Sequence, residues 1–172
     1  MIIEQLDAIR DGILTNQSYF DKGFSDCVLV QDTTRDGIFM ISSQGEHEYA
    51  ALYDYNFFYI RPSGPISVTG GPSEKQLQGR YRLIAFAKDV DLYKFIDCML
   101  SALATFCNQV SITSVEMRAW NILIDEIKKP EIVKAIMSRI HTQNIIAVEF
   151  SLYEFHSQSD LNKCNCNPCK TC

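Results

Sequence analysis

The stretch that decides the fold lies near the end of the chain and reads Asn144-Ile145-Ile146-Ala147-Val148-Glu149-Phe150-Ser151-Leu152-Tyr153-Glu154-Phe155. Its residues alternate in character with a period of two. Successive side chains of a β-strand point to opposite faces of the sheet, so this period indicates a strand. We therefore expect a strand over residues 144–155. One face carries Ile146, Val148, Phe150 and Leu152, and the other carries Ala147, Glu149, Ser151 and Tyr153.

A second strand and a long helix are predicted in the middle of the chain. The run Tyr81-Arg82-Leu83-Ile84-Ala85-Phe86-Ala87 is typical of a strand, and Asp89 or Asp91 can cap the start of the helix that follows. Apolar residues then recur at helical spacing over about four turns, which predicts a long central helix closed by Cys107 and Asn108. The apolar stripe consists of Leu92, Phe95, Ile96, Met99, Leu100, Leu103 and Phe106.

The remaining elements follow from shorter signals. The amphipathic pattern of residues 2–14 predicts an opening helix, and Asp36-Gly37 predicts a turn between two short apolar strands. The glycine-rich residues 70–76 indicate an exposed loop. Further expected elements are a strand within 50–60, one or two strands within 110–124 and a short helix over 131–140.

This order of elements predicts an α+β domain with a mixed, largely antiparallel sheet. We expect the N-terminal helix and the long central helix to pack on one face of that sheet. Residues 1–156 are expected to form a single domain. Residues 157–172 are predicted to be a short, polar, Cys-rich C-terminal tail.

The run from Arg80 to Phe155 resembles the tail-terminator and tail-completion proteins of tailed bacteriophages. The resemblance is carried by the strand Tyr81–Phe86, the bend Lys88-Asp89-Val90-Asp91, the helix Leu92–Cys107 and the final strand Ile145–Leu152. It implies a structural subunit of a virion that forms a closed ring in the neck or tail, at the head–tail connector. Such a ring uses head-to-tail contacts between copies and meets other portal, neck or tail proteins.

Four cysteines fall in the last nine residues: Cys164, Cys166, Cys169 and Cys172. Four thiolates can complete a tetrahedral zinc site, although the usual arrangement has two separated pairs. Disulfides within the tail or across a ring are a comparable alternative, as are free thiols in a solvated tail. The remaining cysteines, Cys27 among them, are expected to behave as small buried hydrophobic residues.

The aromatic residues Tyr53, Tyr55, Phe57, Phe58 and Tyr59 occupy both faces of an expected strand. A sheet covered on both faces explains this, and so does an aromatic patch reserved for a partner. We favour packing in the core. The two alternatives predict opposite exposures for these side chains.

No motif of an enzyme is present: the chain lacks G-x-S-x-G and the phosphate-binding G-x-x-x-x-G-K-[ST]. His47, His141 and His156 lie far apart and beside polar residues, so we expect them at the surface. Glu46-His47-Glu48 is more simply a solvated hairpin tip than a cation site. The sequence therefore favours binding and assembly over catalysis.

Charge and hydropathy restrict the partners and the location. The net charge is −5 and the basic residues are scattered, which argues against sequence-specific nucleic acid binding. The start of the chain does not resemble a signal peptide, and no stretch approaches the roughly 18 apolar residues of a membrane span. We expect synthesis in the host cytoplasm, a virion location and no membrane partner. The alternative function is a small metal-binding adaptor or regulatory protein that uses the C-terminal cysteines.

Overall fold

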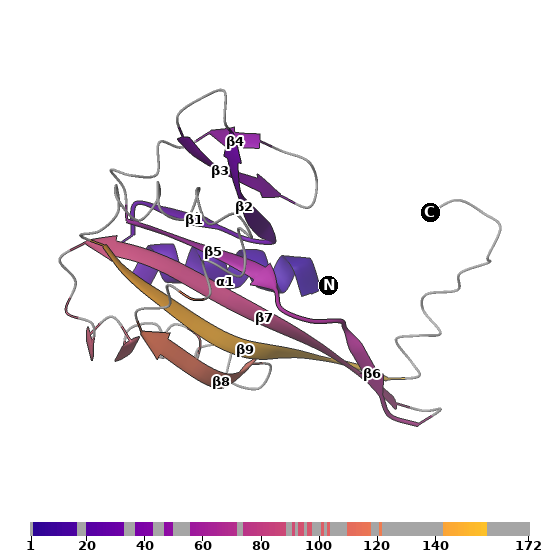
Figure 1. Ribbon diagram of the computed structural model, residues 1–172. Coiled ribbons are helices and arrows are strands. Elements are labelled where there is room, and N and C mark those ends of the chain that lie inside the picture. Colours follow the sequence, from indigo (N-terminus) through magenta and orange to yellow (C-terminus); the bar gives the residue numbers. More distant parts are fainter. Residues whose placement is uncertain are drawn as a thin grey trace.

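The computed structural model describes most of the strands and the N-terminal helix (Figure 1). The described ranges are 2–16, 20–32, 37–42, 47–49, 56–71, 74–88, 110–117 and 143–157, with the single residues Asp91, Tyr93, Lys94, Ile96, Asp97, Ser101, Leu103 and Asn121. The elements are α1 (Ile2–Asn16), β1 (Lys22–Phe24), β2 (Cys27–Asp32), β3 (Gly37–Ser42), β4 (His47–Tyr49), β5 (Phe57–Pro62), β6 (Ser67–Thr69), β7 (Glu74–Lys88), β8 (Val110–Met117) and β9 (Gln143–Ser157).

Six strands form the main sheet, in the order β1-β5-β7-β9-β8 with β6 paired to β7. The β1–β5 pair is parallel and the other pairs are antiparallel. The centre is the pair β7–β9, in which both strands have 15 residues and pair along their whole length. This confirms the α+β class, the largely antiparallel sheet and both principal predicted strands.

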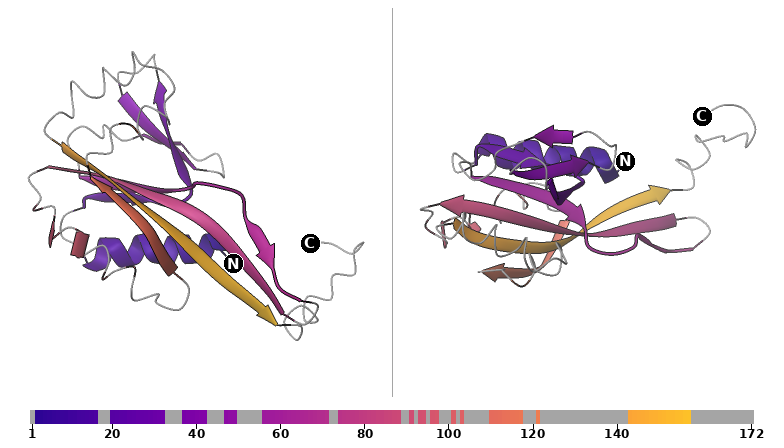
Figure 2. Two further views of the ribbon diagram at one scale, coloured as in Figure 1. Left: turned by 60° about the horizontal axis from the view of Figure 1, so that its bottom comes forward. Right: turned by 45° about the horizontal axis from the view of Figure 1, so that its top comes forward.

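One face of the main sheet packs against α1, and we call it the helix face (Figures 1 and 2). Leu6, Ile9 and Ile13 of α1 are at most 1% exposed. Each turn of the helix therefore adds an apolar side chain to the same core. The sheet residues of this core are Phe58, Ile60, Tyr81, Leu83, Ala85, Ile146, Val148, Phe150 and Leu152.

The other face of the sheet, the opposite face, is also buried at one end. Phe57 and Tyr59 alternate with the helix-face residues of β5 and are at most 1% exposed. The Phe57 and Phe86 rings stack with centroids 4.5 Å apart. Ile84, Ile145 and Ala147 are buried beside them. Core packing is thus confirmed for the described part of the aromatic cluster, while Tyr53 and Tyr55 lie outside the described residues.

The glycine-rich region was predicted wrongly as a loop through residue 76. The chain turns at Gly70, whose φ of 115° lies in the left-handed region that suits glycine. The chain re-enters the sheet at Glu74, which pairs with Ser157 of β9. The pairing of β7 with β6 begins two residues later, at Gln76. The polar residues of this stretch suit an exposed part of a strand as well as a loop, so composition alone did not distinguish the two.

The expected long central helix is described only at isolated positions. Six described residues between Tyr93 and Leu103 have helical backbone. The Asp91 carboxylate accepts hydrogen bonds from the backbone N–H groups of Tyr93 and Lys94, at 3.1 and 3.4 Å, which confirms the predicted helix cap. The continuous helix Leu92–Cys107, the short helix 131–140 and the tail residues 158–172 lie outside the described residues, and β9 includes Ser157.

A second, three-stranded sheet contains β2, β3 and β4 in that order (Figure 2). The β2–β3 pair is antiparallel, and Asp32 lies opposite Gly37 at its end. This confirms the hairpin predicted from the Asp-Gly signal. Cys27, at the start of β2, is 6% exposed, as expected for a small core residue.

Gly79 of β7 leaves room for the ring of Tyr81. A Cβ atom at this position would lie 2.6 Å from the ring edge and 2.8 Å from the hydroxyl oxygen of Tyr81. Tyr81 is buried and stacks on Phe150, with ring centroids 5.9 Å apart. The ring therefore cannot move aside without disturbing the core.

We predict that Gly79→Ala lowers the free energy of unfolding by about 1–3 kcal/mol, the usual cost of overpacking a core. Gly71→Ala is the control, because nothing lies within 4 Å of a Cβ atom there. Urea unfolding followed by circular dichroism measures both variants. Equal stability of the two would show that the Tyr81 ring adapts freely.

Candidate functional site

A cavity of about 320 Å³ opens on the sheet where its opposite face changes from apolar to polar. The cavity is lined by residues of β7, β8 and β9 and by Ser63, in the segment after β5. The residues that line it are Ser63, Gln78, Arg80, Tyr81, Thr113, Glu149, Phe150, Ser151 and Tyr153. Hydroxyl, amide and charged groups predominate in this lining.

Strand register brings these polar residues together. Gln78 lies directly opposite Tyr153, and Arg80 lies directly opposite Ser151. All four belong to the opposite face, because they have the same parity along their strands as the buried Ile84 and Ala147. These four lining residues therefore form a two-by-two block of cross-strand neighbours.

The Gln78 amide holds two hydroxyl groups in place. Its Nε2 atom donates to Ser151 Oγ at 3.3 Å and to Tyr153 OH at 3.2 Å. Ser151 is 2% exposed, which makes it the buried polar residue of the described core. Each hydroxyl accepts one bond from the amide and so keeps its own hydrogen for another acceptor.

Arg80 is the cation of the cavity. Within the described part of the chain its guanidinium has no ion-pair partner. The neighbouring Arg82 donates from Nε to Glu149 Oε1 at 2.9 Å and also contacts that oxygen through its NH2 group. Arg82 thus neutralises the one carboxylate in the lining, so the charge presented by the cavity comes from Arg80.

The chain after β5 holds the backbone of Arg80. The backbone N–H of Ser63 donates to the Arg80 carbonyl at 2.9 Å. A Cβ atom on the next residue, Gly64, would lie 3.9 Å from both Cβ and Cδ of Arg80. The segment therefore passes close to the stem of Arg80, and Arg80 as a whole is exposed.

Tyr81 is among the lining residues, but its ring packs in the core of the helix face. Burial raises the pKa of its phenol, because the charged phenolate would be poorly solvated there, and the nearby Asp26 carboxylate acts in the same direction. The phenol therefore stays neutral well above neutral pH. Tyr81 therefore acts as a neutral core residue beneath the cavity.

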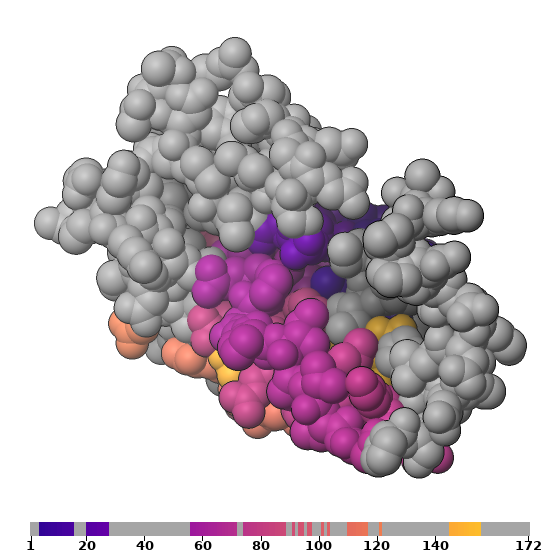
Figure 3. Space-filling view, turned by 90° about the vertical axis from the view of Figure 1, so that its right-hand side faces the viewer, coloured from indigo at the N-terminus to yellow at the C-terminus, as the bar shows by residue number. Residues whose placement is uncertain are grey.

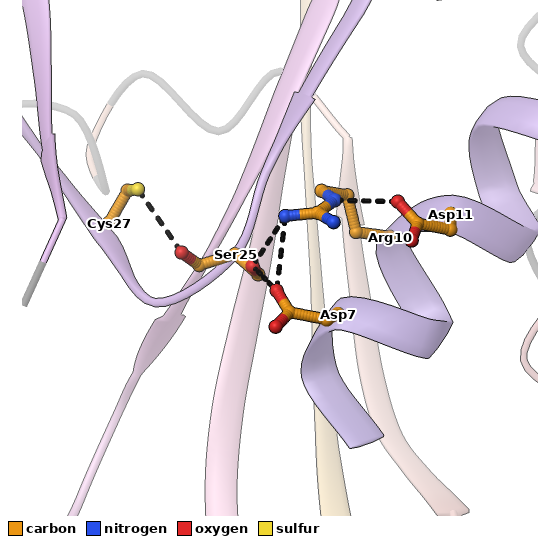
Figure 4. A network of polar contacts seen from close by, with 5 residues as sticks. All are labelled: Asp7, Arg10, Asp11, Ser25 and Cys27. Atoms are coloured by element: carbon orange, nitrogen blue, oxygen red, sulfur yellow. Dashed lines mark hydrogen bonds and ion pairs between the residues drawn. The ribbon is translucent and has the colours of Figure 1, made fainter. Parts of the chain in front are cut away.

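A second polar cluster ties α1 to the turn between β1 and β2 (Figure 4). Arg10 NH1 donates to Asp7 Oδ1 at 3.0 Å and to Ser25 Oγ at 3.1 Å, and Ser25 Oγ donates to Asp7 Oδ1. Cys27 Sγ donates to the Ser25 carbonyl at 3.1 Å. The hydrogen bond and charge of Arg10 lower the pKa of Asp11. These groups satisfy one another, so the cluster holds the helix on the sheet.

Most of the residues that sequence analysis proposed for a site fall outside the described ranges. Cys164, Cys166, Cys169 and Cys172 lie outside the described residues, so zinc, disulfides and free thiols all stay predictions. His47 is in β4 and His156 in β9, and His141 lies outside the described residues. In the described ranges, no three metal-ligating side chains come close enough to hold an ion. No helix among those ranges is long and apolar enough to cross a membrane.

No protein-family model matches this chain, and no curated protein matches it.

Sequence reasoning missed the cavity. The sequence did contain a signal for it, because polar side chains recur at every second position in both strands. These residues are Gln78, Arg80 and Arg82 in one strand and Glu149, Ser151 and Tyr153 in the other. That parity predicts a polar face on each strand. It becomes a site only when the register between the strands is known.

We predict that Ser25→Ala lowers the free energy of unfolding by about 1 kcal/mol, because the half-buried Asp7 carboxylate and Arg10 lose a hydrogen-bond partner. Ser67→Ala is the matched control, since the Ser67 hydroxyl is exposed and its contact with the Gln78 carbonyl is long, at 3.4 Å. Thermal unfolding of both variants provides the comparison. If both changes have the same effect, the polar cluster does not stabilise the helix.

Proposed function

We propose that this chain is a structural protein that assembles with copies of itself into a ring, of the kind found at the neck or tail end of tailed bacteriophages. The resemblance of residues 80–155 to tail-terminator and tail-completion proteins supports this proposal. Other neck, portal or tail proteins are its proposed partners and the virion is its proposed location. The protein acts through assembly and without catalysis.

The observation that carries the proposal is the thin end of the main sheet. We define the ribbon end as residues 66–69, 74–77 and 154–157, where β6, β7 and β9 extend away from α1 (Figures 1 and 2). Figure 3 looks onto this end, where atoms of β6 and β7 lie side by side at the surface. Atoms of the ribbon end are therefore present at the surface.

Both faces of the ribbon end expose apolar side chains. Val68 is 60% exposed and Ile66 is 55% exposed. Val68 pairs with the helix-face residue Leu77, so it extends the apolar helix face beyond α1. Phe155 is 67% exposed and pairs with Gln76 on the opposite face. Apolar side chains exposed on both faces of a projecting ribbon suit insertion between neighbouring subunits.

We also propose that residues 92–107 form the long central helix on the helix face. Asp91 caps the start of this stretch. Leu103 is 1% exposed and belongs to the same core as Leu6, and Ile96 packs against that core. Two helices on one face would leave the ribbon end as the uncovered part of the sheet.

If the protein forms a ring, light scattering of the purified chain should detect a discrete species of many subunits. The double variant with Val68→Asp and Phe155→Asp should dissociate into smaller species. Two exposed apolar side chains are replaced by charges that are costly to bury in an interface. Circular dichroism should be unchanged, since both positions lie outside the buried core.

Tyr93→Asp is the control, because it also removes an exposed aromatic side chain, 75% exposed, from a different part of the chain. Its assembly should match that of the unmodified chain. A chain that remains monomeric at all concentrations would contradict ring formation. An unchanged multimer in the double variant would contradict the role of the ribbon end.

A further inference from the structure

The cavity on the opposite face presents hydrogen-bond donors to whatever occupies it. The hydroxyls of Ser151 and Tyr153 accept from Gln78 and keep their hydrogens, as described above. The Arg80 guanidinium adds up to five N–H donors. The strand register places these residues side by side, the Gln78 amide orients the two hydroxyls, and the Ser63 N–H holds the Arg80 backbone.

We propose that this cavity binds a small hydroxylated organic anion, whose phosphate or carboxylate oxygens are held by Arg80, Ser151 and Tyr153. An oxyanion matches the donors because it offers only acceptors, and charge-assisted hydrogen bonds to guanidinium are the strongest of this type. The ion pair with Arg82 keeps Glu149 from repelling the anion. The proposal is independent of ring assembly.

The remaining lining groups define the rest of the ligand. Since the Gln78 nitrogen makes the two bonds to the hydroxyls, its carbonyl oxygen is available to accept from a ligand hydroxyl. Thr113 Oγ1 donates to the Glu149 carbonyl at 3.1 Å and so offers its lone pairs. The volume of about 320 Å³ is at the lower end for ligand pockets. A molecule of the size of a small sugar phosphate or hydroxy acid fits this description.

The test uses glycerol 3-phosphate, inorganic phosphate and glycerol as probes, titrated into the full-length chain. Backbone amide shifts in nuclear magnetic resonance spectra report where each probe binds. We expect saturable shifts around residues 78–80 and 151–153 with glycerol 3-phosphate, weaker binding of inorganic phosphate and no binding of glycerol. Equal binding of glycerol, or no saturable shifts with any probe, would overturn the proposal.

Arg80→Gln should weaken glycerol 3-phosphate binding by about tenfold or more, because the guanidinium supplies the charge of the site. Tyr153→Phe should weaken it less, since one hydroxyl donor is lost and the ring remains. Lys75→Gln is the matched control: it removes one positive charge from the same strand, on the helix face and outside the cavity. Equal losses from Arg80→Gln and Lys75→Gln would indicate nonspecific charge attraction and would overturn the assignment.

Discussion

The rest of the structure depends on the antiparallel pairing of β7 with β9. Both strands are 15 residues long, and every residue of each has a partner in the other. β5 and β8 add to the two outer sides of this pair, and β6 adds at its end. A slip of one residue would move Val148 and its neighbours from the helix face to the opposite face, so the burial of both faces holds the register.

The same pair of strands changes its chemistry along its length. At one end Phe86 and Ile145 are buried on the opposite face while Ala85 and Ile146 are buried on the helix face. In the middle the helix face stays apolar, but the opposite face becomes polar and contains the cavity. At the ribbon end neither face is covered by α1. One long pair of strands thereby supplies the core, the candidate ligand site and the proposed assembly surface.

Much of the fold was predictable because it depends on local sequence patterns. The alternation of residues 144–155, the helical spacing of Leu6, Ile9 and Ile13, and the Asp-Gly turn signal each depend on backbone geometry within a few residues. The Asp91 cap belongs to the same class, since its oxygen reaches N–H groups two and three residues ahead. The true start of β7 was missed because polar residues in an exposed strand resemble those of a loop.

The sequence by itself determined the secondary structure of these elements and the polar or apolar character of each strand face. Only the tertiary structure decided which polar faces meet. Gln78 and Tyr153 are 75 residues apart in the chain, yet their side chains are hydrogen-bonded. Local periodicity says where a side chain points, but the register between distant strands is set by packing over the whole sheet. For that reason the cavity around Arg80 could be recognised only in the tertiary structure, although the polar character of its residues could be read from the sequence.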